Sequence, residues 1–252
     1  MKIHFVYSSN AKSREAYRHM VKIYGQVPLD KADCIVVLSG DGMVLRAFHE
    51  SFQYNLPIYG MNRGKLGFLT NEYSKENLIE RIQNAAPLKF NPLQTTVVTK
   101  SNGAFSSIAV NEVYLLRETH QSAKLSITVD GDLKLKELVC DGLIIASDIG
   151  STAYNYSAGG AIIPINSGLL ALTPISSFRP RRWRGAVLSD HSKIEIQAID
   201  QERRPVCAVA DYAEFRGATK VCVSKNRSMT LTLLLDKDNT LENKVLAEQF
   251  AT

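Results

Sequence analysis

Residues 35–42 read Ile-Val-Val-Leu-Ser-Gly-Asp-Gly, and this stretch decides the fold. The apolar residues from Cys34 to Leu38 predict a strand buried on both faces. The turn Gly40-Asp41-Gly42 comes next and leads into a helix that we expect from Met43 to Phe52. A buried strand followed at once by a helix is typical of a parallel sheet covered by helices.

The same turn has a composition suited to phosphate. Glycines let the backbone approach an anion, and the free N–H groups at a helix start point outward with the positive end of the dipole. A carboxylate beside phosphates repels them, so Asp41 needs another purpose: accepting a hydrogen bond or proton from a hydroxyl, or holding magnesium. On this motif alone, a solvated turn aspartate is an equal alternative, because Asp-Gly turns are common.

The rest of the N-terminal third continues the alternation of strands and helices. We expect strands from Ile3 to Tyr7 and from Pro57 to Gly60, a helix over residues 12–25, and a helix capped by Ser74 that runs to about Asn84. Pro87 and Pro92 then mark a domain boundary.

From about Leu93 the apolar period changes to two, as in Leu125 to Val129, which predicts half-buried strands. Asp130-Gly131 suits a type I′ hairpin turn, with Leu133 and Leu135 continuing the alternation on the return strand. Further strands are expected at Leu143 to Ala146, Lys193 to Ile199, Val206 to Ala210, Lys220 to Ser224 and Met229 to Leu235.

The tail from Asn239 to Phe250 predicts a helix with an apolar stripe, which we expect to return to the first domain. The stripe consists of Leu241, Val245, Leu246 and Phe250. The predicted fold is therefore an α/β domain with a parallel sheet, residues 1–92 plus 236–252, and a β-rich, β-sandwich-like domain, residues 93–235.

Composition narrows the classes of partner. The chain has 252 residues and a net charge of +5, which suits anionic small molecules or nucleic acid and selects neither. Arg179 to Arg184 form a basic run, but no nucleic-acid module surrounds it, so polyphosphate or subunit contacts are the favoured uses. We expect no nucleic-acid partner.

Compartment and metal content are inferred from what the sequence lacks. Neither the four cysteines nor the five histidines have the spacing of a zinc site, and no disulfide framework is indicated. No signal peptide is recognisable, and no apolar stretch approaches the roughly 20 residues of a membrane span. A cytoplasmic protein without a membrane partner is expected.

Three further polar motifs are candidates for binding. Gly60 to Phe68 is glycine-rich but is no Walker motif, because its glycines are one residue too close and Leu66 stands where a hydroxyl belongs. Asn111-Glu112 interrupts an apolar run and needs either a ligand or an exposed edge strand. Asp141 to Tyr154, leading to Ser157 and two glycines, is rich in small and hydroxyl residues, which suits a purine, ribose or amide, or a tight crossing of elements.

In this order, the motifs resemble the NAD kinase family of the bacterial type: Gly-Asp-Gly, Gly-Met-Asn-Arg-Gly-Lys-Leu-Gly-Phe, Asn-Glu, then Asp-Gly-Leu with Gly-Ser-Thr-Ala-Tyr-Asn. The resemblance covers most of the chain. It implies that ATP phosphorylates the 2′-hydroxyl of the adenosine ribose of NAD, with magnesium or another divalent cation, in a homodimer or homotetramer. It also implies an α/β domain, a β-rich domain and a last helix that returns to the first.

The resemblance implies roles for individual residues as well. Asp41 would lie beside the reacting hydroxyl as the catalytic residue, with phosphate or ATP at Gly40 and Gly42. The residues implied in NAD binding are Asn111, Glu112, Asp141, Thr152, Ala153, Tyr154, Ser157, Asp211 and Tyr212.

The chain departs from the family pattern in two places. It has Ser39 and Met43 in a motif that is usually Gly-Gly-Asp-Gly-Thr, and Asp148-Ile149 in place of a Thr-Pro-type pair. Ser39 is compatible with the motif if its φ is negative. Two rival functions stay open at this point: a lipid or diacylglycerol-type kinase, and a non-catalytic NAD-binding sensor.

Overall fold

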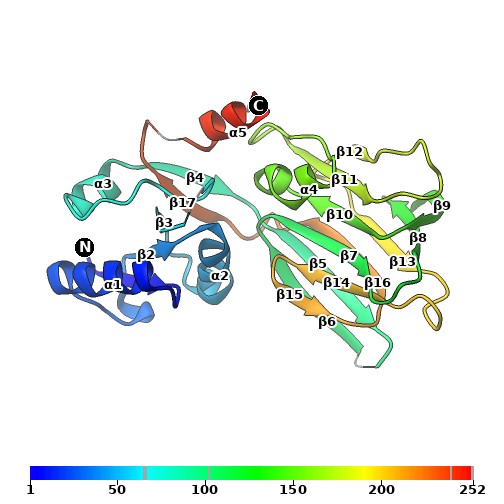
Figure 1. Cartoon of the computed structure of the whole chain (residues 1–252), viewed down its shortest axis with the longest axis horizontal. Helices are drawn as coiled ribbons and strands as arrows, with labels where there is room; N and C mark the ends of the chain where they lie inside the picture. Colours follow the sequence, from blue (N-terminus) through cyan, green and yellow to red (C-terminus); the bar gives the residue numbers. More distant parts are fainter. Residues whose placement is uncertain (65–66, 102, 239, 251–252) are drawn as a thin grey trace. The chain divides into compact units, whose positions relative to one another are not determined.

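The chain divides into two compact units, shown in the computed structural model of Figure 1, which describes residues 1–64, 67–101, 103–238 and 240–250. Met1–Phe90 and Thr230–Thr252 form the first, here called the α/β unit, and Asn91–Met229 form the second, the β unit. The chain returns to the first unit at Thr230, earlier than the expected 235/236 boundary. The last strand therefore belongs to the α/β unit and not to the β-rich one.

The α/β unit is a five-stranded sheet with the order β1-β2-β3-β17-β4 and helices beside it. Its strands are β1 (Ile3–Tyr7), β2 (Cys34–Ser39), β3 (Ile58–Asn62), β4 (Ala86–Phe90) and β17 (Leu231–Leu235). Its helices are α1 (Ala11–Tyr24), α2 (Asp41–Ser51), α3 (Leu78–Asn84) and α5 (Leu241–Gln249), with 3-10 turns η1 (Leu29–Lys31) and η2 (Phe52–Tyr54). The pairs among β1, β2, β3 and β17 are parallel, and β4 adds an antiparallel edge.

Strand β2 is buried along its whole length, as its apolar sequence predicts. Cys34, Val36 and Leu38 share a core cluster with residues of α1 and α3. Ile35 and Val37 point to the opposite face because side chains alternate along a strand, and α2 packs against β2 and β3. The predicted parallel sheet covered by helices is confirmed.

Two helical details differ from the expectations. Helix α3 is preceded by Asn77, whose φ of 53° breaks the helical path, so Ser74 is not its N-cap. Ser74 Oγ instead accepts a hydrogen bond from the N–H of Glu76, in a local turn. In α5 the predicted stripe is only half correct: Leu241 and Val245 are buried, whereas Leu246 and Phe250 are 56% and 78% exposed.

The β unit consists of two antiparallel six-stranded sheets, with the orders β12-β11-β10-β7-β14-β15 and β6-β5-β16-β13-β8-β9. The strands are β5 (Leu93–Thr99), β6 (Gly103–Ala109), β7 (Glu112–Arg117), β8 (Ala123–Val129), β9 (Asp132–Cys140), β10 (Gly142–Ala146), β11 (Leu169–Ile175), β12 (Ala186–Ser189), β13 (Ile194–Ala198), β14 (Val206–Ala210), β15 (Ala213–Phe215) and β16 (Ala218–Lys225). A 3-10 turn, η3 (Ile149–Thr152), and a short helix, α4 (Tyr154–Ser157), follow β10.

One hydrophobic core joins the two sheets of the β unit. Alternate residues of both sheets contribute, among them Leu125 and Ile127 of β8 and Leu143 and Ile145 of β10. This arrangement confirms the predicted β-sandwich-like architecture. The outer face of β10 is covered separately: Ile144 and Ala146 form a second cluster with residues of the segment that follows, Tyr154 included.

The hairpin of β8 and β9 has the predicted turn. Asp130 and Gly131 have φ values of 53° and 88°, as a type I′ turn requires. The predicted alternation on the return strand is wrong at Leu133, which is 59% exposed because β9 starts beyond the edge of the core, but it holds at Leu135, which is half-buried against the core.

Cysteines and helix lengths add two observations. All four cysteines are free thiols; Cys222 is half-buried and the other three are buried. Within the described residues, no helix is both long and apolar enough to cross a lipid bilayer.

Leu125→Ala tests the core between the two sheets. Leu125 is fully buried, so the substitution should destabilise the protein by about 2–5 kcal/mol, with a lower midpoint of urea unfolding. Leu133→Ala on the paired strand is the control, and it should change the midpoint little. Equal effects of the two substitutions would contradict this description of the core.

Candidate active site

Asp41 is the first residue of α2 and is held by a neighbouring loop. Its Oδ2 accepts a hydrogen bond from the N–H of Phe68 at 2.7 Å, and its Oδ1 accepts one from the N–H of Leu69 at 3.0 Å. Thr70 Oγ1 lies 3.5 Å from the same Oδ1. The carboxylate therefore joins the Gly-Asp-Gly turn to the end of the glycine-rich segment that follows β3.

The loop that holds Asp41 is closely packed at Gly67. A Cβ there would lie 1.9 Å from Thr70 Oγ1 and 3.2 Å from Asp41 Oδ1, so a larger residue would displace the Thr70 hydroxyl from the Asp41 carboxylate. On α5, Lys244 supports the loop by donating hydrogen bonds to the carbonyl oxygens of Phe68 and Thr70. The predicted C-terminal helix thus returns to the unit that carries Asp41. Lys65 and Leu66 of the glycine-rich segment lie outside the described residues.

The two charged groups Asp41 and Lys244 are partly shielded from water. Burial raises the pKa of Asp41, while the amides of Phe68 and Leu69 and the charge of Lys244 act in the opposite direction. Burial lowers the pKa of Lys244, against the effects of Asp41 and Asp236. A carboxyl with a raised pKa is a stronger proton acceptor than an ordinary aspartate.

Gly40 and Gly42 leave space on both sides of Asp41. A Cβ at either position would meet no described atom within 4 Å, so an anion can approach the backbone of the turn. Ser39 is the last residue of β2, paired with Asn62, and is absent from the residues of positive φ, so this departure from the family pattern is compatible with the turn. Met43 is half-buried and donates its N–H to the carbonyl of Gly40.

Asn111 and Glu112 lie where β7 begins. Strand β7 is an interior strand, flanked by β10 and β14, so the edge-strand alternative is wrong. Glu112 is only 7% exposed. Asn111 Oδ1 and Glu112 Oε2 are buried and have no hydrogen-bond partner within the part of the chain that the structure describes. Donor groups of a ligand or of water would satisfy these two acceptors.

Asp211 holds the backbone of the same segment. Its carboxylate accepts hydrogen bonds from the N–H groups of Val110, at 2.7 Å, and Asn111, at 2.9 Å. A longer one, at 3.4 Å, comes from the N–H of Glu112. Asp211 has a φ of 52° in the tight turn between β14 and β15. The next residue, Tyr212, is 50% exposed.

Glu112 is the most perturbed carboxyl of this group. Burial, followed by the negative charge of Asp211, raises the pKa of Glu112 from 4.5 to about 8. A ligand that donates hydrogen bonds to the carboxyl group would offset part of the free-energy cost of this burial.

The segment from Gly150 to Ser157 mixes structural and accessible side chains. Ser151 and Asn155 are fully buried, and Asn155 donates to the carbonyls of Ser151 and Ala161, both at 2.9 Å. Thr152, Ala153 and Tyr154 are half-buried and Ser157 is exposed, so these four can contact a ligand. This segment therefore combines buried side chains that fix its conformation with accessible side chains that a ligand can contact.

Asp141 lies at the opposite end of the strands from Glu112. In the register of β7 and β10, Glu112 pairs with Ala146 and Leu116 with Gly142, so the two ends are about 14 Å apart at a rise of about 3.4 Å per residue. Asp141 pairs with Arg117 at 2.6 Å and lines a cavity of about 460 Å³ together with Tyr154.

Tyr154 connects the two ends. Burial raises the pKa of Tyr154, and the charges of Glu112 and Asp141 raise it further. Its ring packs edge-on against Tyr114, with the ring centroids 5.1 Å apart. Glu112, the 152–157 segment and Asp141 thus form a band along β7 and β10, with Glu112 at one end and Asp141 at the other, while Asp211 and Tyr212 lie in the turn between β14 and β15.

Among the described residues, the remaining charged groups form no metal site, and Asp148 is buried. In the described ranges, no group of three or more His, Cys, Asp or Glu side chains is arranged to hold a metal ion. Asp148, the departure from the family pattern, points inward: its side chain is 4% exposed and lies 3.7 Å from Lys225 Nζ.

Comparison with known proteins identifies the family. The ATP-NAD kinase N-terminal domain matches residues 6–87, and the ATP-NAD kinase C-terminal domain matches residues 110–232. The chain belongs to the NAD kinase family. The resemblance seen in the motifs is thereby confirmed.

Individual relatives agree with this assignment. The chain is 44% identical over 247 residues to the NAD kinase of Rhizobium meliloti, covering 98% of this chain and 96% of that protein. It is 47% identical over 247 residues to the NAD kinase of Caulobacter vibrioides, with coverage of 98% and 95%. An NAD kinase from Archaeoglobus fulgidus, solved in complex with ATP, has a TM-score of 0.77 and 25% identity, covering 98% of this chain and 99% of that one.

Several residues that shape the site were not found from the sequence. Gly67, Lys244 and Arg117 act through contacts with residues distant in the chain, so no local pattern marks them. Of these three residues, only Gly67 belongs to a local motif, as the second glycine of the Gly-Lys-Leu-Gly segment. The holding role of Asp211 depends in the same way on pairing between β7 and β14.

Glu112→Gln tests the desolvation at the start of β7. Because the pKa of Glu112 is near 8 in the folded protein and 4.5 in the reference state, its contribution to stability is present below pH 4.5 and is lost as the pH rises through 8. The ligand-free wild type should therefore lose stability over this range relative to Glu112→Gln, as measured by thermal unfolding. The exposed residue Glu214 of the same sheet provides the control, Glu214→Gln. A constant difference between wild type and Glu112→Gln would contradict the raised pKa.

Proposed function

We propose that this chain transfers the γ-phosphoryl group of ATP to the 2′-hydroxyl of the adenosine ribose of NAD and forms NADP. Membership of the NAD kinase family and about 45% identity to curated NAD kinases over nearly the whole chain support this activity. The observation that carries it in the structure is Asp41, held at the start of α2 between two glycines with open space beside them. The lipid-kinase and sensor alternatives are not favoured.

Asp41 is proposed to orient the 2′-hydroxyl and accept its proton. Phosphoryl transfer depends mainly on positioning and charge neutralisation, so the base acts late and the geometry of its carboxylate matters most. The hydrogen bonds from Phe68 and Leu69 fix that geometry, and burial raises the pKa of the group toward the range of an effective base.

The β unit is proposed to hold NAD. Adenosine carries hydrogen-bond donors on its amino group and its ribose, and Asn111 Oδ1 and Glu112 Oε2 are buried acceptors in need of donors. The accessible side chains of the band described above shape the rest of the pocket: Asp141, Thr152, Ala153, Tyr154 and Ser157. We propose that Asp211 acts by holding the Asn111-Glu112 backbone, and that Tyr212 contacts the ligand from the same turn.

Gly40 and Gly42 are proposed to bind phosphate groups through their backbone amides. Magnesium or another divalent cation would neutralise phosphate charge, and such ions are usually bound by one or two carboxylates together with substrate phosphates. Among the described residues no cluster of three or more carboxylate, imidazole or thiol side chains is present, so the cation would be held mainly by the phosphates of the substrates.

The assembly is proposed to be a homodimer or homotetramer. This proposal rests on membership of the NAD kinase family, for which the resemblance of the motifs implies an oligomer. The cytoplasmic location stays a prediction.

Asp41→Asn tests the catalytic role. The substitution keeps the size of the side chain but removes the proton acceptor and one of the two oxygens that accept from Phe68 and Leu69, so kcat should fall by about 10² to 10⁴. The assay contains ATP, magnesium and NAD, and an NADP-specific dehydrogenase detects the product. Glu50→Gln, at an exposed position of the same helix, is the control.

Two outcomes of this assay would contradict the proposal. Activity of Asp41→Asn within threefold of the wild type would remove Asp41 from the role of base. Turnover of 2′-deoxy-NAD would show that the acceptor is not the 2′-hydroxyl, and transfer of labelled phosphate to diacylglycerol but not to NAD would indicate the lipid-kinase alternative.

Removal of divalent cations should abolish the activity. Without them, the phosphate charges of ATP are left to the amides of the turn alone. Excess chelator should therefore reduce NADP formation to background, and added magnesium should restore it. Undiminished turnover in chelator would show that the transfer proceeds without a divalent cation.

A further inference from the structure

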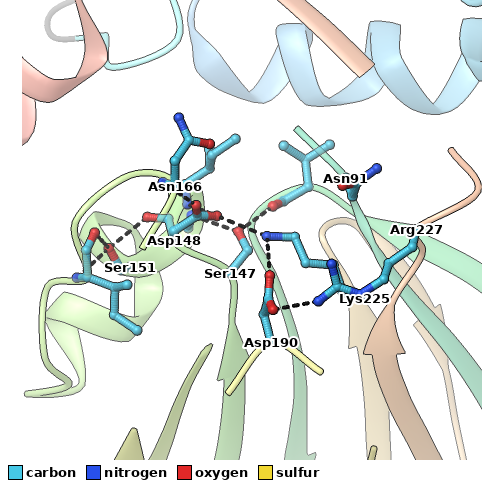
Figure 2. A network of polar contacts seen from close by, with 12 residues as sticks. Asn91, Ser147, Asp148, Ser151, Asn166, Asp190, Lys225 and Arg227 are labelled. Atoms are coloured by element: carbon cyan, nitrogen blue, oxygen red, sulfur yellow. Dashed lines mark hydrogen bonds and ion pairs between the residues drawn. The ribbon is translucent and has the colours of Figure 1, made fainter. Parts of the chain in front are cut away.

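A buried ion cluster lies beside the loop that carries Gly150 to Tyr154 (Figure 2). Lys225 Nζ, at the end of β16, is 3.3 Å from Asp190 Oδ2 and 3.7 Å from Asp148 Oδ1. Arg227 Nη2 lies 2.5 Å from Asp190 Oδ1. The side chains of Asp148, Lys225 and Asp190 are 4%, 8% and 9% exposed. Buried charges of this kind are costly to leave unpaired.

Asp148 connects the cluster to the loop. Its Oδ1 accepts a hydrogen bond from the N–H of Ile149, the first residue of η3, and its Oδ2 accepts one from the N–H of Asn166 at 2.8 Å. Ser151 Oγ adds a bond to the carbonyl of Asp148 at 2.8 Å. One side chain thus ties three segments together: the start of η3, the turn at Asn166 and the end of β16.

The same loop is bonded to the segment that carries Asn111 and Glu112. Ser147 donates its N–H to the carbonyl of Asn111 at 2.9 Å and its Oγ–H to the carbonyl of Val110 at 2.7 Å. Gly150 packs so closely that a Cβ would lie 2.2 Å from the carbonyl oxygen of Asn111. A displacement at Asp148 would therefore be passed on to both sides of the proposed NAD site.

We propose that Asp148 is a positioning residue for the proposed NAD site, and that the ion pair of Asp148 with Lys225 keeps the 147–154 loop in its binding conformation. This inference rests on the proposed function. Asp148 touches no substrate; it acts through the backbone of η3 and through Ser147. The cluster contains two carboxylates and two cationic side chains, so removing any single one of the four leaves its charges unbalanced.

Three variants test whether the ion pair of Asp148 with Lys225 holds the 147–154 loop, a role here called the tether: Asp148→Asn, Lys225→Met, and the double variant. Asp148→Asn keeps an oxygen for the amide of Asn166 but removes the charge and the acceptor of the Ile149 amide. Lys225→Met leaves two carboxylates with Arg227 alone. Each single variant should raise KM for NAD about tenfold, as expected for loss of a charged interaction. KM for ATP should stay unchanged and kcat should stay within about threefold, because Asp41 and its loop are untouched.

The double variant gives the sharpest readout. Asp148→Asn combined with Lys225→Met leaves Asp190 and Arg227 as a balanced pair, so KM for NAD should lie below that of Lys225→Met alone. If each substitution only disrupted the local structure independently of the other, the two increases in KM for NAD would add. A double variant worse than either single variant would overturn the proposal.

Amide hydrogen exchange provides a measurement that needs no turnover. Peptides covering residues 147–166 should exchange faster in Asp148→Asn and Lys225→Met, because the amides of Gly150, Ile163 and Asn166 are protected by bonds made in this loop. Glu195→Gln, which breaks the Lys220–Glu195 pair of 2.8 Å elsewhere in the same unit, is the control and should leave both exchange and KM unchanged.

The two readouts separate this inference from the proposed function. Unchanged exchange and an unchanged KM for NAD in both single variants would overturn the tether even if the wild type is an active NAD kinase. Faster exchange in a protein without any NAD kinase activity would support the tether and refute the proposed function.

Discussion

Backbone N–H groups in the loops of this protein need acceptors where no strand or helix supplies one, and aspartate carboxylates meet that need. Asp41 accepts from the loop after β3, Asp211 from the start of β7, and Asp148 from the turn at Asn166. A hydrogen bond from a neutral N–H to a carboxylate is stronger than one between neutral groups. Each carboxylate therefore holds a loop that bears candidate site residues, and the site depends on these contacts.

The same constraint leaves other acceptors unsatisfied. Asp211 takes up the amides around Asn111 and Glu112, but the side-chain oxygens of these two residues have no partners of their own among the described residues. A buried polar group in that state costs about 1–3 kcal/mol. The chain accepts this cost at one end of the β7 and β10 band, and a ligand with donors in the right places would recover it. Such a ligand is selected by the pattern of its donors, since a molecule without them would leave the acceptors unpaired.

The sequence predicted correctly those elements in which the spacing of the apolar residues matches the faces that are buried in the structure. Strand β2 is apolar throughout and is buried on both faces, and β8 alternates and lies with one face on the core. Strand β4 was missed because Pro87 indicated a boundary; the strand tolerates proline because it lies at the edge of its sheet. Leu246 was predicted to belong to the buried stripe of α5, but it is exposed in the structure. The spacing of apolar residues identifies one face of a helix; it does not show how much of that face is covered.

The candidate site could be predicted in its residue types but not in its contacts. Asp41 is conspicuous in its turn, yet its dependence on Phe68 and Leu69 follows from a loop 27 and 28 residues away. That dependence does not exclude chemistry at Asp41. A carboxylate offers about four lone-pair sites, and the two amides and the hydroxyl of Thr70 occupy three of them. One site remains for a donor from outside the chain, and because the others are fixed, that donor would approach in a defined direction.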